Sequence, residues 1–332
     1  MAEMPVMLIL QAVGGFLLLL GGAELLVRGS VAIARRMGVS TMAIGMTVVA
    51  FGTSAPELIV SLQAALSGAP GIAVGNIVGS NIANVLLIIG LTAVCMPITA
   101  QPQPLVRDSL TIVGSSLLFV VLMWSGTIGT LDGLLLLLVF VLFMVMSYMG
   151  SAKGGGKAAS GATTRSLEAE AAEMGSLPDG AWVPWIATVI GLAGLALGSD
   201  LLVEGGSGMA RLLGVSEAVI GLTMIAVGTS LPELAASVAA SLHRQPDVAV
   251  GNVLGSNLFN MLFVGGTVAV VAPLAIDERI LAFDMWIMLA VTVLFLPVLL
   301  GGRFGRWGGL LFLLLYGGYI ALQFYGSPTL VG

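Results

Sequence analysis

Two glutamates lie well inside long apolar segments of this sequence, and small residues that carry oxygen surround each of them. Glu57 ends the stretch Gly-Thr-Ser-Ala-Pro-Glu, and Glu233 ends the nearly identical stretch Gly-Thr-Ser-Leu-Pro-Glu. An ionisable group inside an apolar segment is costly to bury, so both glutamates are candidates for function. Residues three and four apart share one face of a helix. This spacing predicts hydroxyl groups beside each carboxylate, from Thr53, Ser54, Thr229 and Ser230.

Further oxygen atoms are predicted from the next apolar segments and from the backbone. Each of these segments carries a serine and an asparagine four residues apart, which places both on one helix face. The pairs are Ser80 with Asn84 and Ser256 with Asn260. A proline removes a backbone donor, clashes with the carbonyl four residues back and so kinks the helix. The prolines before the two glutamates therefore predict carbonyl oxygens of Ala50 and Ala226 that are free to face an ion.

This set of donors is typical of a site for a hard metal cation, because it holds oxygen but neither sulfur nor imidazole. Two carboxylates in one apolar site repel each other unless a cation neutralises them. Ca²⁺ accepts about six to eight oxygen ligands in flexible geometry, whereas Mg²⁺ releases its water reluctantly. We therefore expect Ca²⁺ as a transported ion, with Na⁺ or H⁺ occupying the same carboxylates when Ca²⁺ leaves. No cofactor is expected.

The two glutamate segments belong to an internal repeat. Residues 45–84 and 221–260 are identical at 21 of 40 aligned positions, at a constant offset of 176 residues. Weaker matches at the same offset extend outward and include Glu24 with Asp200. The repeat unit therefore spans about half of the chain. We expect a first five-helix repeat at 1–150, a polar linker at 151–182 and a second five-helix repeat at 183–332.

Composition predicts a helical membrane protein. Hydrophobic residues make up 58% of the chain and charged residues only 9%, whereas soluble domains carry about 25% charged residues. Apolar runs of about 20 residues, the length of a membrane-crossing helix, recur along the chain. The fold class is therefore an all-α polytopic membrane protein. Its ten transmembrane helices are expected at 5–27, 39–67, 71–96, 108–125, 131–149, 183–203, 215–243, 248–272, 284–300 and 307–326.

The basic residues predict an orientation for these helices. Ten of the twelve Lys and Arg residues fall on one predicted side of the membrane, and Arg211 and Arg279 fall on the other. Basic residues favour the cytoplasm, so we expect both termini outside it and the central linker inside, in the cell (inner) membrane. Five helices is an odd number, so the second repeat must be inverted relative to the first. Inverted repeats are common in transporters.

At these residues the sequence resembles the cation/calcium exchanger superfamily, in particular prokaryotic sodium/calcium exchangers. The resemblance covers nearly the whole chain and rests on two motifs that each occur twice, Gly-Thr-Ser-x-Pro-Glu and Gly-Asn-x-x-Gly-Ser-Asn. It implies Ca²⁺/Na⁺ exchange by alternating access, in which the first and sixth helices slide across the rest. It also implies that Glu57 and Glu233 are the central ion-binding carboxylates. The other implied ligands are the side chains of Thr53, Ser54, Ser80, Asn84, Thr229, Ser230 and Ser256 and the carbonyls of Ala50 and Ala226.

The sequence departs from this superfamily at Asn260, where the well-studied sodium/calcium members carry an aspartate. Two carboxylates then remain instead of three, and proton-coupled relatives work with two glutamates. H⁺/Ca²⁺ antiport is therefore the alternative to Na⁺/Ca²⁺ exchange.

Other classes of protein are less compatible with the sequence. Paired carboxylates also serve as acid and base in enzymes, but the predicted core offers no histidine and no repeated cysteine. A channel would need the glutamates along a continuous pore, with flux independent of any counter-ion. Nucleic acid is not expected as a partner, because no basic patch exists. The one histidine, His243, lies beside Arg244 and Gln245 at a predicted helix end, where a loop position is expected rather than a metal role.

Overall fold

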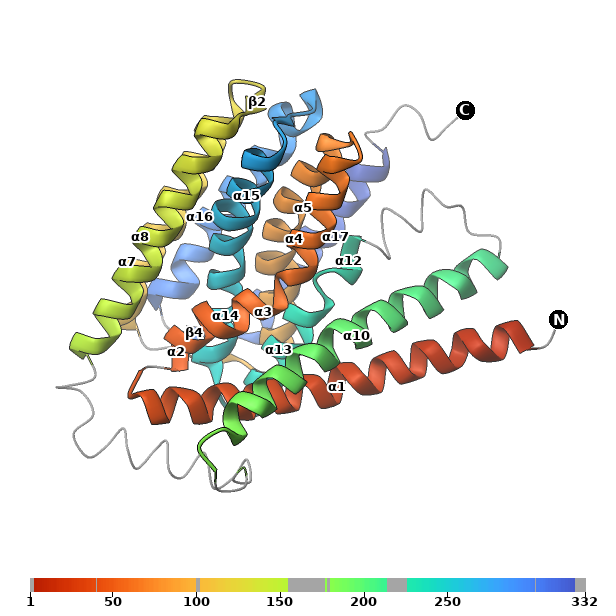
Figure 1. Cartoon of the computed structure of the whole chain (residues 1–332), viewed down its shortest axis with the longest axis vertical. Coiled ribbons are helices and arrows are strands. Elements are labelled where there is room, and N and C mark those ends of the chain that lie inside the picture. The colour runs from red at the N-terminus through yellow and green to blue at the C-terminus, as the bar shows by residue number, and fades with distance from the viewer. Residues whose placement is uncertain are drawn as a thin grey trace.

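The computed structural model describes residues 3–39, 41–99, 102–154, 177, 180–213, 226–301 and 303–325. Helices account for most of these residues and pack into one bundle, which α1 and α10 cross side by side at a steep angle (Figure 1). Large hydrophobic side chains are exposed along the outer helices. In water such a surface would be unfavourable, so the bundle fits a lipid environment.

The segment that carries Glu57 is a broken helix. It begins with α2 (Thr41–Ile44), the π-helical turn η1 (Gly45–Val49) and α3 (Ala50–Thr53). It then continues as α4 (Ala55–Leu66), and the axis bends by 43° between the two parts. Pro56 lies in the first turn of α4, where its missing N–H leaves no intrahelical bond unmade. The proline therefore starts a new helix and places Glu57 in its first turn.

The segment that carries Glu233 repeats this arrangement in its described part. The short α12 (Ala226–Gly228) precedes α13 (Leu231–Leu242), and Pro232 lies in the first turn of α13. The start of the helix predicted at 215–243 lies outside the described residues, because the description resumes at residue 226. Glu233 therefore occupies the same place in α13 that Glu57 occupies in α4.

Two long helical segments form the centre of the bundle. The first consists of α5 (Pro70–Ala83), η2 (Asn84–Ile89) and α6 (Gly90–Cys95). The second consists of α14 (Pro246–Leu258), η4 (Phe259–Val264) and α15 (Gly265–Val271). Both are mostly buried inside the protein. Each contains a π-helical turn at its asparagine, and such turns are frequent at functional sites.

The remaining helices enclose this centre, and short strand pairs join their ends. The helices are α7 (Pro102–Met123), α8 (Thr130–Gly154), η5 (Ile280–Asp284) with α16 (Met285–Gly301), and α17 (Arg306–Tyr325). Strand β1 (Ile98–Thr99) pairs antiparallel with β4 (Arg303–Phe304). Strand β2 (Thr127–Ile128) pairs antiparallel with β3 (Leu274–Ala275). Adding the repeat offset of 176 residues to β1 gives β3, and adding it to β2 gives β4. Each pair therefore joins one strand from each half of the chain, and the two pairs are equivalent by the repeat.

Helices α1 (Glu3–Met37) and α10 (Val183–Leu212) form a tight antiparallel pair. Their backbones touch at glycines spaced seven residues apart, which are Gly15, Gly22 and Gly29 in α1 and Gly191, Gly198 and Gly205 in α10. A Cβ atom at Gly22 would lie 2.8 Å from the carbonyl oxygen of Gly191, so no larger residue fits without separating the helices. Small residues of this kind let membrane helices approach closely.

The structure agrees with the predicted helical fold class. The predicted number of ten transmembrane helices stays a prediction. Every segment predicted as a span contains helix among the described residues. Six helices are long and apolar enough to cross a membrane, or seven if the bent pair is one span. Helix α8 continues to Gly154, four residues into the predicted linker. Most of that linker lies outside the described residues.

Candidate ion-binding site

Glu57 and Glu233 meet in the middle of the bundle. Their exposed fractions are 1% and 0%, and they are close enough to repel each other electrostatically. Each lies in the first turn of its helix, where the positive end of the helix dipole favours a negative charge. The fold therefore brings together two carboxylates that are 176 positions apart in the sequence.

Hydrogen bonds cross between the halves at these carboxylates. The hydroxyl of Ser54 donates to Oε1 of Glu233 at 2.9 Å, and the hydroxyl of Ser230 donates to Oε1 of Glu57 at 3.4 Å. Thr53 and Ser256 also interact with Glu233, as Thr229 does with Glu57. The helical spacing places Ser54 beside Glu57 on one face, but the structure shows that its hydroxyl serves the glutamate of the opposite half. One site is thus built from both halves.

Several buried oxygens at this site have no hydrogen-bond partner among the described residues. They include Oε2 of Glu57, Oε2 of Glu233 and Oδ1 of Asn84. Both side-chain polar atoms of Asn260 are likewise unpaired within the described part of the chain. Buried polar atoms normally have a partner, since leaving one unpaired costs about 1–3 kcal/mol. A set of unpaired acceptor oxygens beside two carboxylates provides a place for a cation.

Two asparagines hold the glutamate-bearing turns in place. The amide of Asn76 donates to the carbonyl of Glu57 at 3.3 Å and to Oγ of Ser61 at 3.0 Å. Asn252 makes the equivalent bonds to the carbonyl of Glu233 and to the Ser237 hydroxyl, also at 3.3 and 3.0 Å. Thr53 donates to Oδ1 of Asn252 at 3.2 Å, which joins the two halves again. These asparagines position the site through hydrogen bonds between helices, the role that the sequence favours for them over ion contact.

The asparagines at the two π-helical turns differ in their contacts. Nδ2 of Asn84 donates to Oδ1 of Asn257 at 2.9 Å, so the amide orientation of Asn84 is fixed and its oxygen is left over. Asn260 makes no such bond within the described residues, although it is fully buried. The repeat-equivalent positions are therefore unequal, and the amide of Asn260 can turn either its oxygen or its nitrogen towards a ligand.

The backbone carbonyls do not all behave as the proline argument predicts. The Ala50 carbonyl accepts hydrogen bonds from the Ser54 N–H at 3.0 Å and from the Thr53 hydroxyl at 3.4 Å. It is therefore engaged within its own helix rather than free. The carbonyl of Gly228, four residues before Pro232, accepts instead from Ser199 of α10 at 2.5 Å. Ala226 lies in α12, and only its backbone is described.

The other predicted ligands lie in the buried centre. Ser80 is 4% exposed on α5, and Ser256 is fully buried on α14. The described residues contain no cluster of three or more His, Cys, Asp or Glu residues. The donor set in the described part of the chain is thus two carboxylates with neutral oxygens, which is suited to hard cations.

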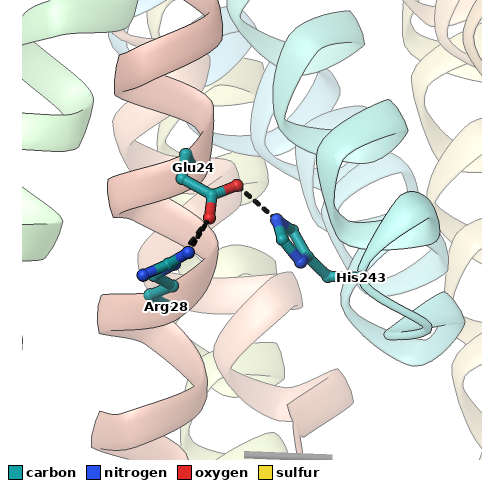
Figure 2. Close-up of polar contacts among 3 residues, drawn as sticks. All are labelled: Glu24, Arg28 and His243. Carbon is teal, nitrogen blue, oxygen red and sulfur yellow. Dashed lines mark hydrogen bonds and ion pairs between the residues drawn. The ribbon is translucent and has the colours of Figure 1, made fainter. Parts of the chain in front are cut away.

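His243 lies in the turn at the end of a helix, as the sequence predicts, and its side chain also contacts a second helix. It caps the C-terminal end of α13, and its Nε2 contacts Oε2 of Glu24 on α1 (Figure 2). The other oxygen of Glu24 accepts a hydrogen bond from Nε of Arg28 at 2.6 Å. The contact joins residues 219 positions apart, so no local sequence pattern could indicate it.

Comparison with known proteins identifies the group to which this architecture belongs. The sequence profile of the "Sodium/calcium exchanger protein" family matches residues 7–149 and 183–325. The chain belongs to this family. It is therefore a multi-pass membrane protein of a transporter family rather than of an enzyme family. The two matched ranges are equal in length and separated by the same 176 residues as the internal repeat.

Individual relatives cover almost the full length of the chain. CaxA of Alkalimonas amylolytica is 39% identical, and the match covers 93% of this chain and 96% of CaxA. The sodium/calcium exchanger MaX1 of Methanosarcina acetivorans is 31% identical and covers 94% and 97%. A structure of the sodium-calcium exchanger NCX_Mj, soaked without Na⁺ and Ca²⁺, has a TM-score of 0.80 at 30% identity, covering 95% and 98%. The fold and the exchanger family therefore agree, and the chain is a cation/Ca²⁺ antiporter.

Proposed function

We propose that the protein is a secondary active antiporter that exchanges Ca²⁺ for Na⁺ by alternating access, at a site built around Glu57 and Glu233. The observation that carries this proposal is the pair of fully buried carboxylates from opposite halves, each with one oxygen unpaired among the described residues. A Ca²⁺ ion carries the charge that neutralises both. Two monovalent cations can do the same on the return path, so occupancy by the two kinds of ion is mutually exclusive.

The ligands we propose are those predicted from the sequence. The carboxylates of Glu57 and Glu233 bind every transported cation. The hydroxyls and amides complete the shell, from Thr53, Ser54, Ser80, Asn84, Thr229, Ser230, Ser256 and Asn260. The Ala50 carbonyl accepts two hydrogen bonds, and we propose that it binds an ion in place of the longer one, from the Thr53 hydroxyl at 3.4 Å. Ala226 is proposed as its equivalent in the other half.

The proposal includes ten membrane spans in two inverted repeats, with the lipid bilayer as the surrounding partner. The antiparallel pairing of α1 with α10 supports inversion, as does the exchange of halves in the strand pairs. We place the side that carries Arg28, Arg35 and Arg36 in the cytoplasm, because basic residues favour that side. Both termini would then lie outside the cytoplasm and the central linker within it.

H⁺/Ca²⁺ exchange is the second candidate, and Asn260 is the specific observation that favours it. An amide replaces the third carboxylate, and it has no hydrogen-bond partner among the described residues. Protons neutralise two carboxylates without further ligands, whereas Na⁺ needs several oxygens at each position. The name of the relative MaX1 favours sodium for that protein.

The decisive experiment uses purified protein in liposomes loaded with labelled Ca²⁺. An inward Na⁺ gradient is imposed in one experiment and an inward proton gradient in another. The gradient that drives Ca²⁺ efflux identifies the counter-ion. We expect the Na⁺ gradient to drive Ca²⁺ out. If neither gradient moves Ca²⁺, the protein is not a calcium antiporter.

Glutamine variants of the two carboxylates test the site itself. Glu57→Gln and Glu233→Gln should each abolish exchange while the protein remains folded, because each removes one of two charges that bind Ca²⁺. Glu204→Gln is a matched control, since Glu204 is exposed on α10. Exchange that survives in either site variant would remove that glutamate from the site.

A further inference from the structure

A polar cluster outside the ion site joins α1 to the far end of α13. It consists of Glu24 and Arg28 on α1 and of His243 at the C-cap of α13 (Figure 2). Both oxygens of Glu24 are engaged, one by Arg28 and the other by His243. We propose that this cluster, called the latch below, holds α1 against α13. In doing so, it stabilises the conformation in which the ion path is closed on the arginine-bearing side.

The latch is not a metal site, although it contains a carboxylate and an imidazole. The Arg28 guanidinium lies 2.6 Å from Glu24 and already supplies its positive charge. A cation bound there would be repelled at short range. The side chains of Glu24 and Arg28 are each 34% exposed, and that of His243 is 24% exposed. The cluster therefore lies at the edge of the helix interface, where it can open without burying an unpaired charge.

The latch connects two bodies that alternating access would move relative to each other. Helix α1 is fixed to α10 by the glycine contacts, and Arg36 donates to the carbonyls of Gly180 and Ala181 just before α10, both at 2.7 Å. Helix α13 belongs to the bundle and carries Glu233 in its first turn. At 1.5 Å per residue, His243 lies about 15 Å along α13 from that glutamate. A contact at His243 thus ties the α1–α10 pair to the helix that holds the ion.

The internal repeat shows that the latch exists at one end only. At the offset of 176 residues, Glu24 corresponds to Asp200, Arg28 to Glu204 and His243 to Ser67. All three equivalents are exposed, and none is basic. Among the described residues, α1 packs along α13 over a substantial contact, whereas α10 packs far less against α4. In the described structure the α1–α13 end is therefore packed together, and the α10–α4 end has no contact of comparable extent.

This asymmetry has a functional consequence if, as the proposed function holds, the two ends open in turn. In a symmetric inverted repeat, the two access states would contain equivalent contacts. Here only one state contains the latch, so its contacts bias the resting protein towards closure on the arginine-bearing side. Release of an ion on that side requires Glu24 and His243 to separate. A ligand or mutation shifts such an equilibrium only by its differential interaction with the two states.

Cysteine accessibility measures this closure directly. Ala240 is fully buried in the apolar cluster between α1 and α13, one turn before His243. In a Cys95→Ser background, which removes the native exposed thiol, an Ala240→Cys variant reports opening as faster reaction with a water-soluble thiol reagent. The readout is a rate on the intact protein in liposomes, independent of transport.

The expected results follow from breaking a partly exposed charged contact. Glu24→Gln and His243→Gln should each increase the labelling rate roughly 2- to 10-fold. The double variant should label no faster than the faster single variant, because the two side chains act through one contact. His243→Lys, which keeps a nitrogen donor facing Glu24, should retain slow labelling. Asp200→Asn, at the repeat-equivalent position, should have no effect.

The same data separate failure of the latch from failure of the proposed function. Unchanged labelling in Glu24→Gln and His243→Gln would overturn the latch, even if the protein exchanges Ca²⁺ normally. Additive rate increases in the double variant would also overturn it. Should either glutamine variant fail to fold, the His243→Lys comparison and the remaining single variant decide the question. If labelling responds but the unmodified protein moves no Ca²⁺, the latch stands and the proposed function fails.

Discussion

Replacing Gly22 by alanine tests whether α1 and α10 are held together by direct backbone contact. The new Cβ atom would lie 2.8 Å from the Gly191 carbonyl oxygen and 2.8 Å from the Leu195 nitrogen. Both neighbours are backbone atoms, so no side chain can rotate away. Ordinary van der Waals contact begins at 3.4 Å. The two helices must therefore move apart by about 0.6 Å to accept the new Cβ atom. A gap of that size loses a quarter or more of the dispersion energy between the atoms in contact.

Overpacking of this kind costs about 1–3 kcal/mol. The adjacent Gly21 is a matched control, since a Cβ there would meet nothing within 4 Å. Gly21→Ala should be neutral or stabilising by up to about 1 kcal/mol, because alanine favours a helix more than glycine does. The free energies of unfolding of the two variants should therefore differ by roughly 1–4 kcal/mol.

The assay compares melting temperatures of both variants with the unmodified protein in the same detergent, and Ca²⁺ exchange in liposomes. Gly22→Ala should melt several degrees lower than Gly21→Ala and exchange more slowly, because a loosened pair no longer moves as one unit. Equal melting temperatures for the two variants would show that the close backbone contact does not exist and that α1 and α10 are not held together by it.

Three further substitutions test other parts of the structure. Asn260→Asp should make Ca²⁺ exchange more dependent on Na⁺, because it adds a third carboxylate to the site; an unchanged ion profile in liposomes would contradict this. Ser54→Ala should raise the Ca²⁺ concentration for half-maximal exchange about 10-fold or more, since it removes a hydrogen bond of 2.9 Å to the charged Glu233. An unaltered Ca²⁺ dependence would show that this hydroxyl does not support the bound state. Asp284→Ala should destabilise the protein by about 1–3 kcal/mol, because it removes the acceptor of the Tyr319 hydroxyl and of the Gln323 amide, and an unchanged melting temperature would count against these bonds.

The sequence by itself determined the features that depend on local pattern. Apolar length predicts membrane helices, and a constant offset between matching motifs reveals the repeat. The same motifs indicate Glu57 and Glu233, because a carboxylate inside an apolar segment is conspicuous in any arrangement of the helices. The proline before each glutamate predicts a break in the helix, and the structure places the break there for Glu57.

Only the tertiary structure decided which helices meet and which atoms remain unpaired. Periodicity shows which residues share a face, but it does not show what that face contacts. Thus Ser54 was expected beside Glu57, yet its hydroxyl reaches Glu233 of the other half. The difference between Asn84 and Asn260 likewise arises from a partner, Asn257, that only folding brings near. Glu24 and His243 show the same limit, because a contact between residues 219 positions apart depends on how whole helices pack.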